Sequence, residues 1–260
     1  MSLIPLSEQT VFAEKNISLI ASDMDGTLTR NSKFTSALLK ALEALAAAKI
    51  SVLLVTGRSA GWVQGLKSYL PVTGAIAENG GVFFPANSDQ PKLLTPIPDL
   101  ITHRQQLAAT FAYLKSHFSQ IQESTDNPFR LTDWTFDVQG LTTTELQQLE
   151  KLCHGKNWGF TYSTVQCHIK PENQTKATSL LQVLNSYFPQ ITTENLITVG
   201  DSPNDETLFD RSIFPFSVGV ANILHYKDKL KFLPTYVTSL AEGEGFRELA
   251  ELVLLNNNHP

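Results

Sequence analysis

Three β-strand patterns that lie far apart in the sequence each stop at a short group of chemically reactive side chains. The apolar runs 17–22, 50–55 and 196–199 have the length of buried strands. They are followed by Asp23-Met24-Asp25-Gly26-Thr27, by Thr56-Gly57-Arg58 and by Gly200-Asp201-Ser202-Pro203-Asn204-Asp205. In an open parallel sheet the carboxyl ends of the strands form the ligand crevice, so such a fold brings all three groups together.

Helical patterns separate these strands and indicate the fold class. The segment 33–49 is rich in Leu and Ala at helical spacing, and further helical patterns lie before residue 70, at 175–188 and at 245–255. The order strand, helix, strand is typical of a parallel sheet with right-handed crossovers. The sequence therefore predicts an α/β protein with a doubly wound, Rossmann-like parallel sheet.

The regular alternation stops after a short third strand at 75–77. Prolines then become frequent, and the pattern changes to helices expected at 100–118 and 142–153 and strands expected near 134–136 and 159–169. This change of pattern predicts an inserted, smaller α+β cap domain at 84–169 within a core made of 1–83 and 170–260. We expect the insert to act as a mobile lid that pivots at Asn79-Gly80-Gly81 and near Thr175.

Composition excludes several classes of protein. The 260 residues carry 20 basic and 25 acidic side chains, a formal net charge of −5, so no basic face is expected for binding nucleic acid. Neither a secretion signal nor a membrane span is evident, and we expect a cytoplasmic protein. Cys153 and Cys167 are expected to be buried thiols, because their spacing fits neither a zinc site nor a disulfide framework. The oligomeric state stays open.

Four carboxylates, those of Asp23, Asp25, Asp201 and Asp205, lie at the predicted crevice. Their mutual repulsion requires a cation nearby if all are ionised. Oxygen ligands with room for water suit Mg²⁺ better than zinc, which prefers nitrogen and sulfur. An isolated Asp at a strand end is usually a turn former or a helix cap. Four of them at converging strand ends predict a Mg²⁺ site.

The acidic pair at the first strand end permits a division of labour. Because Asp23 and Asp25 stand two residues apart beside a glycine, one carboxylate can attack as a nucleophile while the other transfers a proton. At the second strand end, the Thr56 hydroxyl and the Gly57 backbone N–H are donors of the kind that hold phosphoryl oxygens. These residue types together favour phosphoryl transfer.

A phosphoryl group beside these acids also needs a fixed positive charge. The candidates after the insert are Lys170 and Lys176. Lys176 follows Thr175, a candidate N-cap, and lies in the first turn of a helix, where the helix dipole disfavours a cation. Because such local misfits are typical of functional sites, we favour Lys176.

The last candidates lie where the chain returns from the insert to the core. As a strand, residues 166–170 place Gln166, His168 and Lys170 on one face and Cys167 and Ile169 on the other. The apolar face must pack. The polar face either meets the substrate and sets specificity or belongs to a solvated edge strand without a ligand. Single polar residues of the insert are further candidates for substrate contact: His103, His117, Arg130, Asp133 and Trp134.

Taken in order, the motifs resemble those of the haloacid dehalogenase superfamily of phosphotransferases. Residues 23–29 are similar to its nucleophile motif, 56–58 to the second motif, Lys176 to the third-motif lysine and 200–205 to the acidic fourth motif. The insert lies between the second and third motifs, as in the Cof-like branch, subclass IIB with a C2 cap. A weaker resemblance links the chain to mannosyl-3-phosphoglycerate and sucrose-phosphate phosphatases. Ala177 and Glu206-Thr207 depart from the pattern of many relatives and leave the substrate open.

The resemblance implies a phosphatase that hydrolyses a phosphomonoester, such as a sugar phosphate or a glycosyl-phosphoglycerate, in two steps. Asp23 would attack phosphorus to form an aspartyl-phosphate, and Asp25 would protonate the leaving oxygen and then deprotonate water. Mg²⁺ would be held by the carboxylates of Asp23, Asp201 and Asp205 and by the backbone carbonyl of Asp25. The implied phosphoryl ligands are Thr56, Gly57, Lys176 and Asn204.

Two other functions share part of this pattern. A phosphomutase of the same superfamily would return the phosphoryl group to its small phosphorylated substrate instead of to water. A non-enzymatic phospho-accepting module, such as a receiver domain, also uses an Asp and Mg²⁺ at sheet ends. Such a module is about half this size and needs no acid two residues after its Asp, so the sequence favours the enzymes.

Overall fold

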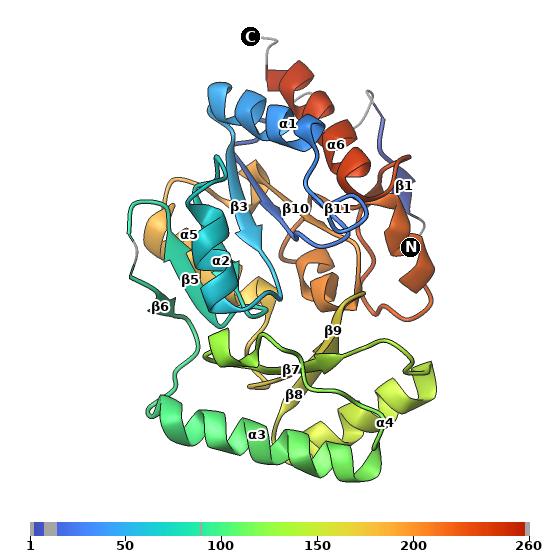
Figure 1. The fold of residues 1–260 in the computed structure, drawn as a ribbon. Coiled ribbons are helices and arrows are strands. Elements are labelled where there is room, and N and C mark those ends of the chain that lie inside the picture. Colours follow the sequence, from blue (N-terminus) through green and yellow to red (C-terminus); the bar gives the residue numbers. More distant parts are fainter. Residues whose placement is uncertain (1–2, 8–14, 89, 258–260) are drawn as a thin grey trace.

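The structure, a computed structural model, describes residues 3–7, 15–88 and 90–257. Its larger part is built on a nine-stranded sheet with the strand order β1-β12-β11-β10-β2-β3-β4-β5-β6 (Figure 1). The strands are β1 (Ile4–Pro5), β2 (Leu19–Ser22), β3 (Ser51–Val55), β4 (Gly74–Ala77), β5 (Val82–Pro85), β6 (Lys92–Leu93), β10 (Leu196–Gly200), β11 (Ser217–Gly219) and β12 (Tyr236–Val237). All pair in parallel except β5 and β6.

Helices cover both faces of this sheet, which confirms the doubly wound α/β fold. One face packs against α1 (Ser36–Ala47), α2 (Ala60–Lys67) and α6 (Glu242–Asn257), and the other against α5 (Lys176–Tyr187) and the 3-10 helix η4 (Pro203–Phe209). Helix α1 begins where the Thr35 hydroxyl accepts a hydrogen bond from the backbone N–H of Leu38, and it buries one apolar stripe against the sheet. Among the described residues, no helix has the length and apolarity needed to cross a membrane.

The three strands with reactive ends are neighbours in the sheet. Strand β2 pairs in parallel with β10 on one side and with β3 on the other, and Ser22 lies beside both Val199 and Leu54. The strands therefore end at the same edge of the sheet. The ladder continues one residue further, since the backbone N–H of Asp23 donates to the carbonyl of Val199 at 2.9 Å. The predicted convergence of the three groups follows from this register.

The chain beyond β4 differs from the expectation. A tight turn, with Glu78 and Asn79 in the left-handed region and Gly80 at φ +109°, returns the chain antiparallel as β5 and then β6. The turn at Asn79-Gly80-Gly81 thus joins two strands of the large sheet, and the pivot expected there is wrong. A methyl group at position 81 would lie 1.8 Å from the Thr132 hydroxyl, so the turn is closely packed. We propose that the insert begins after β6.

The smaller part is an antiparallel sheet with the order β7-β9-β8, covered on its outer face by two helices (Figure 1). Its elements are α3 (Leu100–His117), the 3-10 helix η2 (Asn127–Phe129), β7 (Trp134–Asp137), α4 (Thr143–His154), β8 (Gly159–Tyr162) and β9 (Gln166–Lys170). Cys153 and Cys167 are free and buried in its core, as expected. Strand β9 is central and buried throughout, so the alternative of a solvated edge strand is wrong. Its polar face is buried because it faces the larger part of the molecule.

Candidate active site

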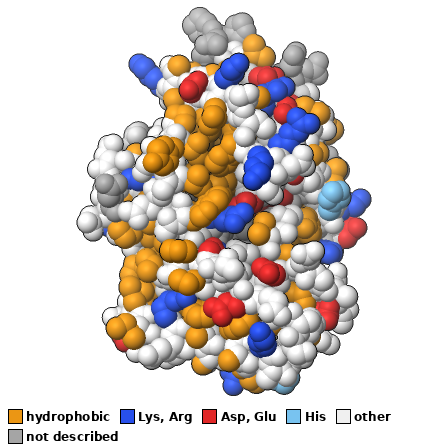
Figure 2. All heavy atoms as spheres, in the orientation of Figure 1, with side chains coloured by type: hydrophobic (Ala, Val, Ile, Leu, Met, Phe, Trp, Pro, Cys, Tyr) orange, Lys and Arg blue, Asp and Glu red, His pale blue; other side chains and the backbone are white. Residues whose placement is uncertain are grey.

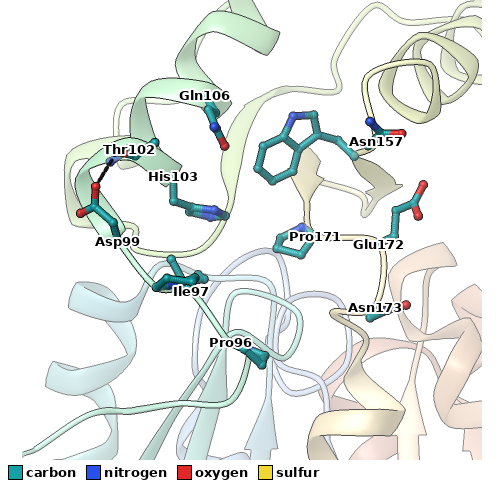
Figure 3. A pocket seen from close by; sticks show the side chains of 12 residues that line it. Pro96, Ile97, Asp99, Thr102, His103, Gln106, Asn157, Pro171, Glu172 and Asn173 are labelled. Carbon is teal, nitrogen blue, oxygen red and sulfur yellow. Dashed lines mark hydrogen bonds between the residues drawn. The ribbon is translucent and has the colours of Figure 1, made fainter.

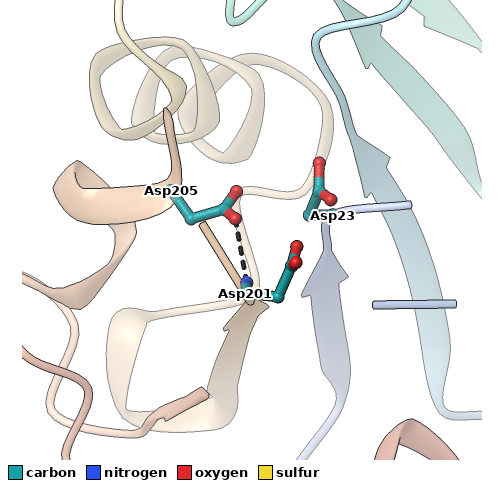
Figure 4. Close-up of side chains that lie close together, drawn as sticks. All are labelled: Asp23, Asp201 and Asp205. Carbon is teal, nitrogen blue, oxygen red and sulfur yellow. Dashed lines mark hydrogen bonds between the residues drawn. The ribbon is translucent and has the colours of Figure 1, made fainter. Parts of the chain in front are cut away.

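Three of the predicted acids form one buried cluster (Figure 4). Asp23 follows β2, Asp201 follows β10, and Asp205 lies in η4. One carboxylate oxygen from each residue lies within 4.8 Å of those of the other two. One Asp205 oxygen accepts the backbone N–H groups of Asp201 at 2.9 Å and Ser202 at 3.1 Å, which fixes the carboxylate at the start of η4.

Lys176 is the cation of this cluster. Its ammonium group donates to Asp23 Oδ1 at 2.5 Å and to Asp205 Oδ1 at 2.6 Å, and the side chain is fully buried. Although burial lowers the pKa of a lysine, the charges of Asp205 and Asp23 raise the pKa of Lys176 above its ordinary value. Lys170 instead donates to the backbone carbonyl of Gln174 at 2.6 Å. Of the two candidate lysines, the structure therefore places Lys176 among the acids.

One lysine does not balance three buried carboxylates. Burial, followed by the charge of Asp205, raises the pKa of Asp23 to about 7. Burial and the charge of Asp23 raise the pKa of Asp201 well above its ordinary value. Oxygen ligands that resist ionisation until a positive charge arrives are suited to a hard divalent cation. The donor set of the described residues therefore fits Mg²⁺.

Asp25 does not join this cluster, so the expectation of four crowded carboxylates is corrected to three. Its two oxygens accept hydrogen bonds from Arg58 Nε at 2.8 Å and from a terminal guanidinium nitrogen at 2.6 Å. The Arg58 guanidinium also stacks on Trp62, 4.7 Å from the ring centroid. This two-pronged ion pair turns the Asp25 carboxylate away from the three acids.

Two further side chains, which the sequence analysis did not select for this role, hold Asp201. The Thr27 hydroxyl donates to one oxygen at 3.1 Å, and the Asn222 amide donates to the other at 2.8 Å. Gly26 lies against the same carboxylate with φ +79°, and a methyl group there would come within 2.4 Å of an Asp201 oxygen. The glycine of the first motif therefore serves both the turn and the close approach of Asp201.

A cavity opens between the acids and the smaller sheet. Its lining combines the strand ends with the turn between β8 and β9, namely Asp23, Asp25, Thr56, Gly57, Arg58, Ser163, Val165, Gln166, His168 and Asn204. Acidic and basic side chains gather where the two parts meet (Figure 2). The free volume is about 10 Å³, which is room for about one water molecule. The described conformation is therefore closed.

Three of the candidate phosphoryl ligands, Thr56, Gly57 and Asn204, line this cavity, whereas Lys176 lies behind Asp23 and does not. The Thr56 hydroxyl accepts the backbone N–H of Arg58 at 3.2 Å. The Asn204 amide donates to the side-chain oxygen of Asn79 at 3.0 Å and accepts from the Ser202 hydroxyl at 2.7 Å. Gly57 leaves space for its neighbours, since a methyl group there would lie 3.1 Å from the His168 ring.

The predicted specificity residues separate into two groups. Gln166 and His168 line the cavity, whereas Lys170 does not. Both cavity residues join a buried network of the smaller part, in which Arg130 donates to Asp133 at 2.9 Å and to the Gln166 amide oxygen at 2.9 Å. Arg130 and Asp133 thus act on the cavity through its lining residues.

The other candidates of the insert lie away from the acids. A larger cavity of about 560 Å³ lies beside the two chain segments that connect the parts, and residues 96–99 and 171–173 of these segments line it. His103 lies on its wall (Figure 3). The His103 ring contacts the Thr132 carbonyl at 2.9 Å. The Trp134 ring packs under Arg104, and His117 packs against Tyr113. None of the three lines the cavity at the acids.

Glu78 is a residue at the junction that the sequence analysis missed. Its buried carboxylate accepts the backbone N–H of Ala60 at 2.9 Å, the N–H of Thr132 at 2.7 Å and the Thr132 hydroxyl at 2.7 Å. It therefore joins the start of α2 to the insert. Glu78 directly follows β4, so its place at a strand end was the sequence signal that could have identified it.

Comparison with known proteins agrees with this geometry. The family model of the haloacid dehalogenase-like hydrolases matches residues 20–127 and 99–245. A phosphoglycolate phosphatase of Methanothrix thermoacetophila is 29% identical over 239 residues, which cover 90% of this chain and 96% of that protein. Phosphoglycolate phosphatase 1 of Saccharolobus solfataricus is 30% identical, with 92% and 96% covered.

Solved structures show the same fold. A crystal structure of a Thermoplasma acidophilum protein aligns with a TM-score of 0.71 at 20% identity and covers 91% of this chain and 99% of that one. The sucrose-phosphatase of Synechocystis, solved with sucrose and phosphate, aligns with a TM-score of 0.65 at 16% identity and covers 92% and 98%. The chain therefore belongs to the haloacid dehalogenase-like hydrolases, the phosphatase family that its motifs predicted.

Proposed function

We propose that this enzyme is a Mg²⁺-dependent phosphatase that hydrolyses a small phosphomonoester through an aspartyl-phosphate on Asp23. One observation carries the proposal: the Asp23 carboxylate belongs to the three-acid cluster, contacts Lys176 and also lines the cavity. A carboxylate placed between a cation site and a substrate cavity can attack phosphorus while the charge on the phosphoryl oxygens is neutralised.

The surrounding residues would divide the remaining work. Asp23, Asp201 and Asp205 would hold Mg²⁺, with the Asp25 backbone carbonyl as the ligand that the family resemblance implies. The metal would supply charge neutralisation to the phosphoryl oxygens. Lys176 would hold the Asp23 carboxylate in place and contribute a second positive charge. The remaining contacts to the phosphoryl oxygens are assigned to Thr56, Gly57 and Asn204.

Asp25 would be the general acid and then the general base. It lines the cavity, and its carboxylate lies outside the three-acid cluster and is therefore available for proton transfer. Arg58 holds the Asp25 carboxylate in an ion pair, with 2.6 Å between the nearest nitrogen and oxygen atoms. Protonation of the leaving oxygen then requires this pair to loosen when substrate is bound. Arg58 is thus assigned to positioning.

The relatives indicate the substrate. In the closed conformation the cavity has room for about one water molecule, so it must enlarge for any substrate and its size does not select the leaving group. Relatives that cover about nine-tenths of this chain are named phosphoglycolate phosphatases. We therefore propose 2-phosphoglycolate, or a phosphomonoester of similar size, in place of the sugar phosphate that the motifs suggested.

The buried thiols suit the reducing cytoplasm that the sequence predicts.

Release of inorganic phosphate tests this function. With Mg²⁺ present, the enzyme should release phosphate from 2-phosphoglycolate faster than from glucose 6-phosphate or sucrose 6-phosphate. A phosphomutase would rearrange its substrate without stoichiometric phosphate. A protein that becomes phosphorylated but never turns over would instead be a phospho-accepting module.

Mg²⁺ should stabilise the folded protein more as the pH rises. Because the pKa of Asp23 is raised to about 7 in the metal-free folded state, this state binds more protons than the unfolded chain between about pH 4 and 7. The contribution of Asp23 to the stability of the metal-free folded state is therefore greatest at low pH and is lost as the pH rises through 7. We expect the increase in Tm on adding Mg²⁺ to be larger at pH 7.5 than at pH 5. An equal increase at both pH values would contradict the assignment of Asp23 as a ligand.

The insert should open to admit substrate. Gln174 ties the segments that connect the two parts, since its amide donates to the Glu78 carbonyl at 2.6 Å and accepts from the Thr95 hydroxyl at 3.0 Å. Limited proteolysis should cut within 94–99 or 171–175, and a phosphate analogue bound with Mg²⁺ should slow this cutting. Gln174→Ala should speed cutting in the free protein, and Gln147→Ala, on the exposed side of α4, should not. If neither the phosphate analogue nor Gln174→Ala changed the rate of cutting, opening at these segments would be ruled out.

A further inference from the structure

The insert presents one histidine to the cavity, and its two ring nitrogens have different surroundings. His168 on β9 is 1% exposed, and its Nδ1 lies 2.8 Å from an Asp133 oxygen. The opposite edge of the ring faces Gly57, where a methyl group would lie 3.1 Å from both Cε1 and Nε2. Among the described residues, Nε2 has no hydrogen-bond partner. His168 therefore turns an unpaired nitrogen toward the cavity wall that holds the expected phosphoryl ligands.

A buried ion pair fixes this orientation. Arg130 donates to the two oxygens of Asp133 at 2.9 and 3.0 Å, and it also donates to the Gly57 carbonyl at 3.0 Å. Although burial raises the pKa of an aspartate, Arg130 and His168 hold the pKa of Asp133 below its ordinary value. An ionised carboxylate only accepts, so Nδ1 carries the hydrogen, and Nε2 donates only when the ring is protonated.

The other cations of the site are already engaged. Lys176 is bound to Asp23 and Asp205, and Arg58 is bound to Asp25. On the side of the cavity that the insert forms, His168 is a neutral group that becomes a cation by taking up a proton.

The charges around the ring are of both signs. On the insert, Asp133 and Asp126 favour its cationic form, and Arg130 opposes it. Across the cavity lie Asp23, Asp25 and Arg58. In the free enzyme, burial is the largest influence and lowers the pKa of His168. A carboxylate that entered the cavity beside Nε2 would favour the protonated ring.

We propose that His168 is the specificity-determining residue of the insert and binds a carboxylate on the leaving group of the substrate. The inference rests on the proposed function and deepens it. As the substrate binds, the ring takes one proton from solvent, and Nε2–H then donates to the substrate carboxylate while Nδ1–H stays on Asp133. The recognised class is a small phosphomonoester with a carboxylate close to the phosphate, in preference to one with a hydroxyl group there.

Two substrates of similar size separate these classes: 2-phosphoglycolate, with a carboxylate, and 2-hydroxyethyl phosphate, with a hydroxyl group. The wild-type enzyme should prefer the carboxylate by roughly 10- to 100-fold in kcat/KM, the range of one charge-assisted hydrogen bond. His168→Ala should remove most of this preference, mainly through KM for 2-phosphoglycolate. His154→Ala changes an exposed histidine of α4 that contacts Glu172, and it should keep the wild-type ratio.

The wild-type enzyme provides a second test that needs no variant. Because kcat/KM reports groups of the free enzyme, the ratio of the two kcat/KM values should fall between pH 6 and 8, by at most about tenfold per pH unit. Phosphate ionisation and metal binding cancel in this ratio. A ratio that is independent of pH, is unchanged by His168→Ala or favours the hydroxyl compound would overturn the assignment of His168. Failure to release phosphate from these compounds and from p-nitrophenyl phosphate would instead contradict the proposed function itself.

Discussion

Replacing Asp23 by Asn should lower phosphate release by about 10⁴-fold or more, the effect typical of removing a residue that acts in the covalent step. The amide cannot form the acyl-phosphate, and it also removes one of the three clustered ligands. The measurement is kcat for 2-phosphoglycolate or p-nitrophenyl phosphate at saturating Mg²⁺.

The loss should come from chemistry and not from unfolding. Because burial raises the pKa of Asp23 to about 7, replacing its carboxylate relieves charge repulsion in the metal-free protein, and Lys176 keeps Asp205 as a partner. The Tm of the metal-free variant should therefore stay close to that of the wild type. Asp228→Asn, which changes an exposed acid outside the cavity, should leave kcat unchanged and serves as the control. Wild-type turnover in Asp23→Asn would place the nucleophile elsewhere.

Removal of divalent metal should abolish turnover as completely. Without a divalent cation the pKa of Asp23 stays raised to about 7, which weakens its carboxylate as a nucleophile, and Lys176, which contacts Asp23 and Asp205, is left to neutralise the phosphoryl oxygens. Excess chelator should reduce phosphate release to background, and added Mg²⁺ should restore it. Ca²⁺, which prefers more ligands and longer bonds, should restore much less activity.

A matched variant separates the metal site from the phosphoryl contacts. Asp201→Asn should raise the Mg²⁺ concentration needed for half-maximal activity, because Asp201 is a proposed ligand that neither attacks phosphorus nor lines the cavity. Thr56→Ala should raise KM for substrate while leaving the Mg²⁺ requirement unchanged. Full turnover in excess chelator would contradict a metal-dependent reaction.

The catalytic edge of the sheet was predictable because local sequence determines it. Buried strands such as β2 and β10 appear as apolar runs, and parallel topology brings their carboxyl ends together whatever lies between them. Asp23 and Asp201 were therefore predictable as neighbours in space although 178 positions separate them in the sequence. The choice of Lys176 over Lys170 followed from a local conflict with the helix dipole, and the structure places Lys176 among the acids.

Side-chain pairing and the seating of the insert were not predictable. The rotation of Asp25 toward Arg58 joins two neighbouring strand ends through rotamers that the sequence does not reveal, and the burial of the polar face of β9 depends on how the smaller part is seated on the larger. Strand alternation assigns His168 to a face, but it does not reveal whether that face meets solvent or protein. The antiparallel return at β5 was also missed, because a short apolar run after a glycine turn does not show which sheet it joins.

The most direct test of the central claim is detection of the covalent intermediate. In Asp25→Asn the first step should be slow but possible, whereas activation of water is lost, so phosphorylated enzyme should accumulate. After rapid quenching with acid, mass spectrometry should find one phosphoryl group per chain, on the peptide that contains Asp23, and none in Asp23→Asn. Turnover of the wild type with no phosphoryl group trapped on Asp23 in Asp25→Asn, or with the group on another residue, would contradict the proposed mechanism.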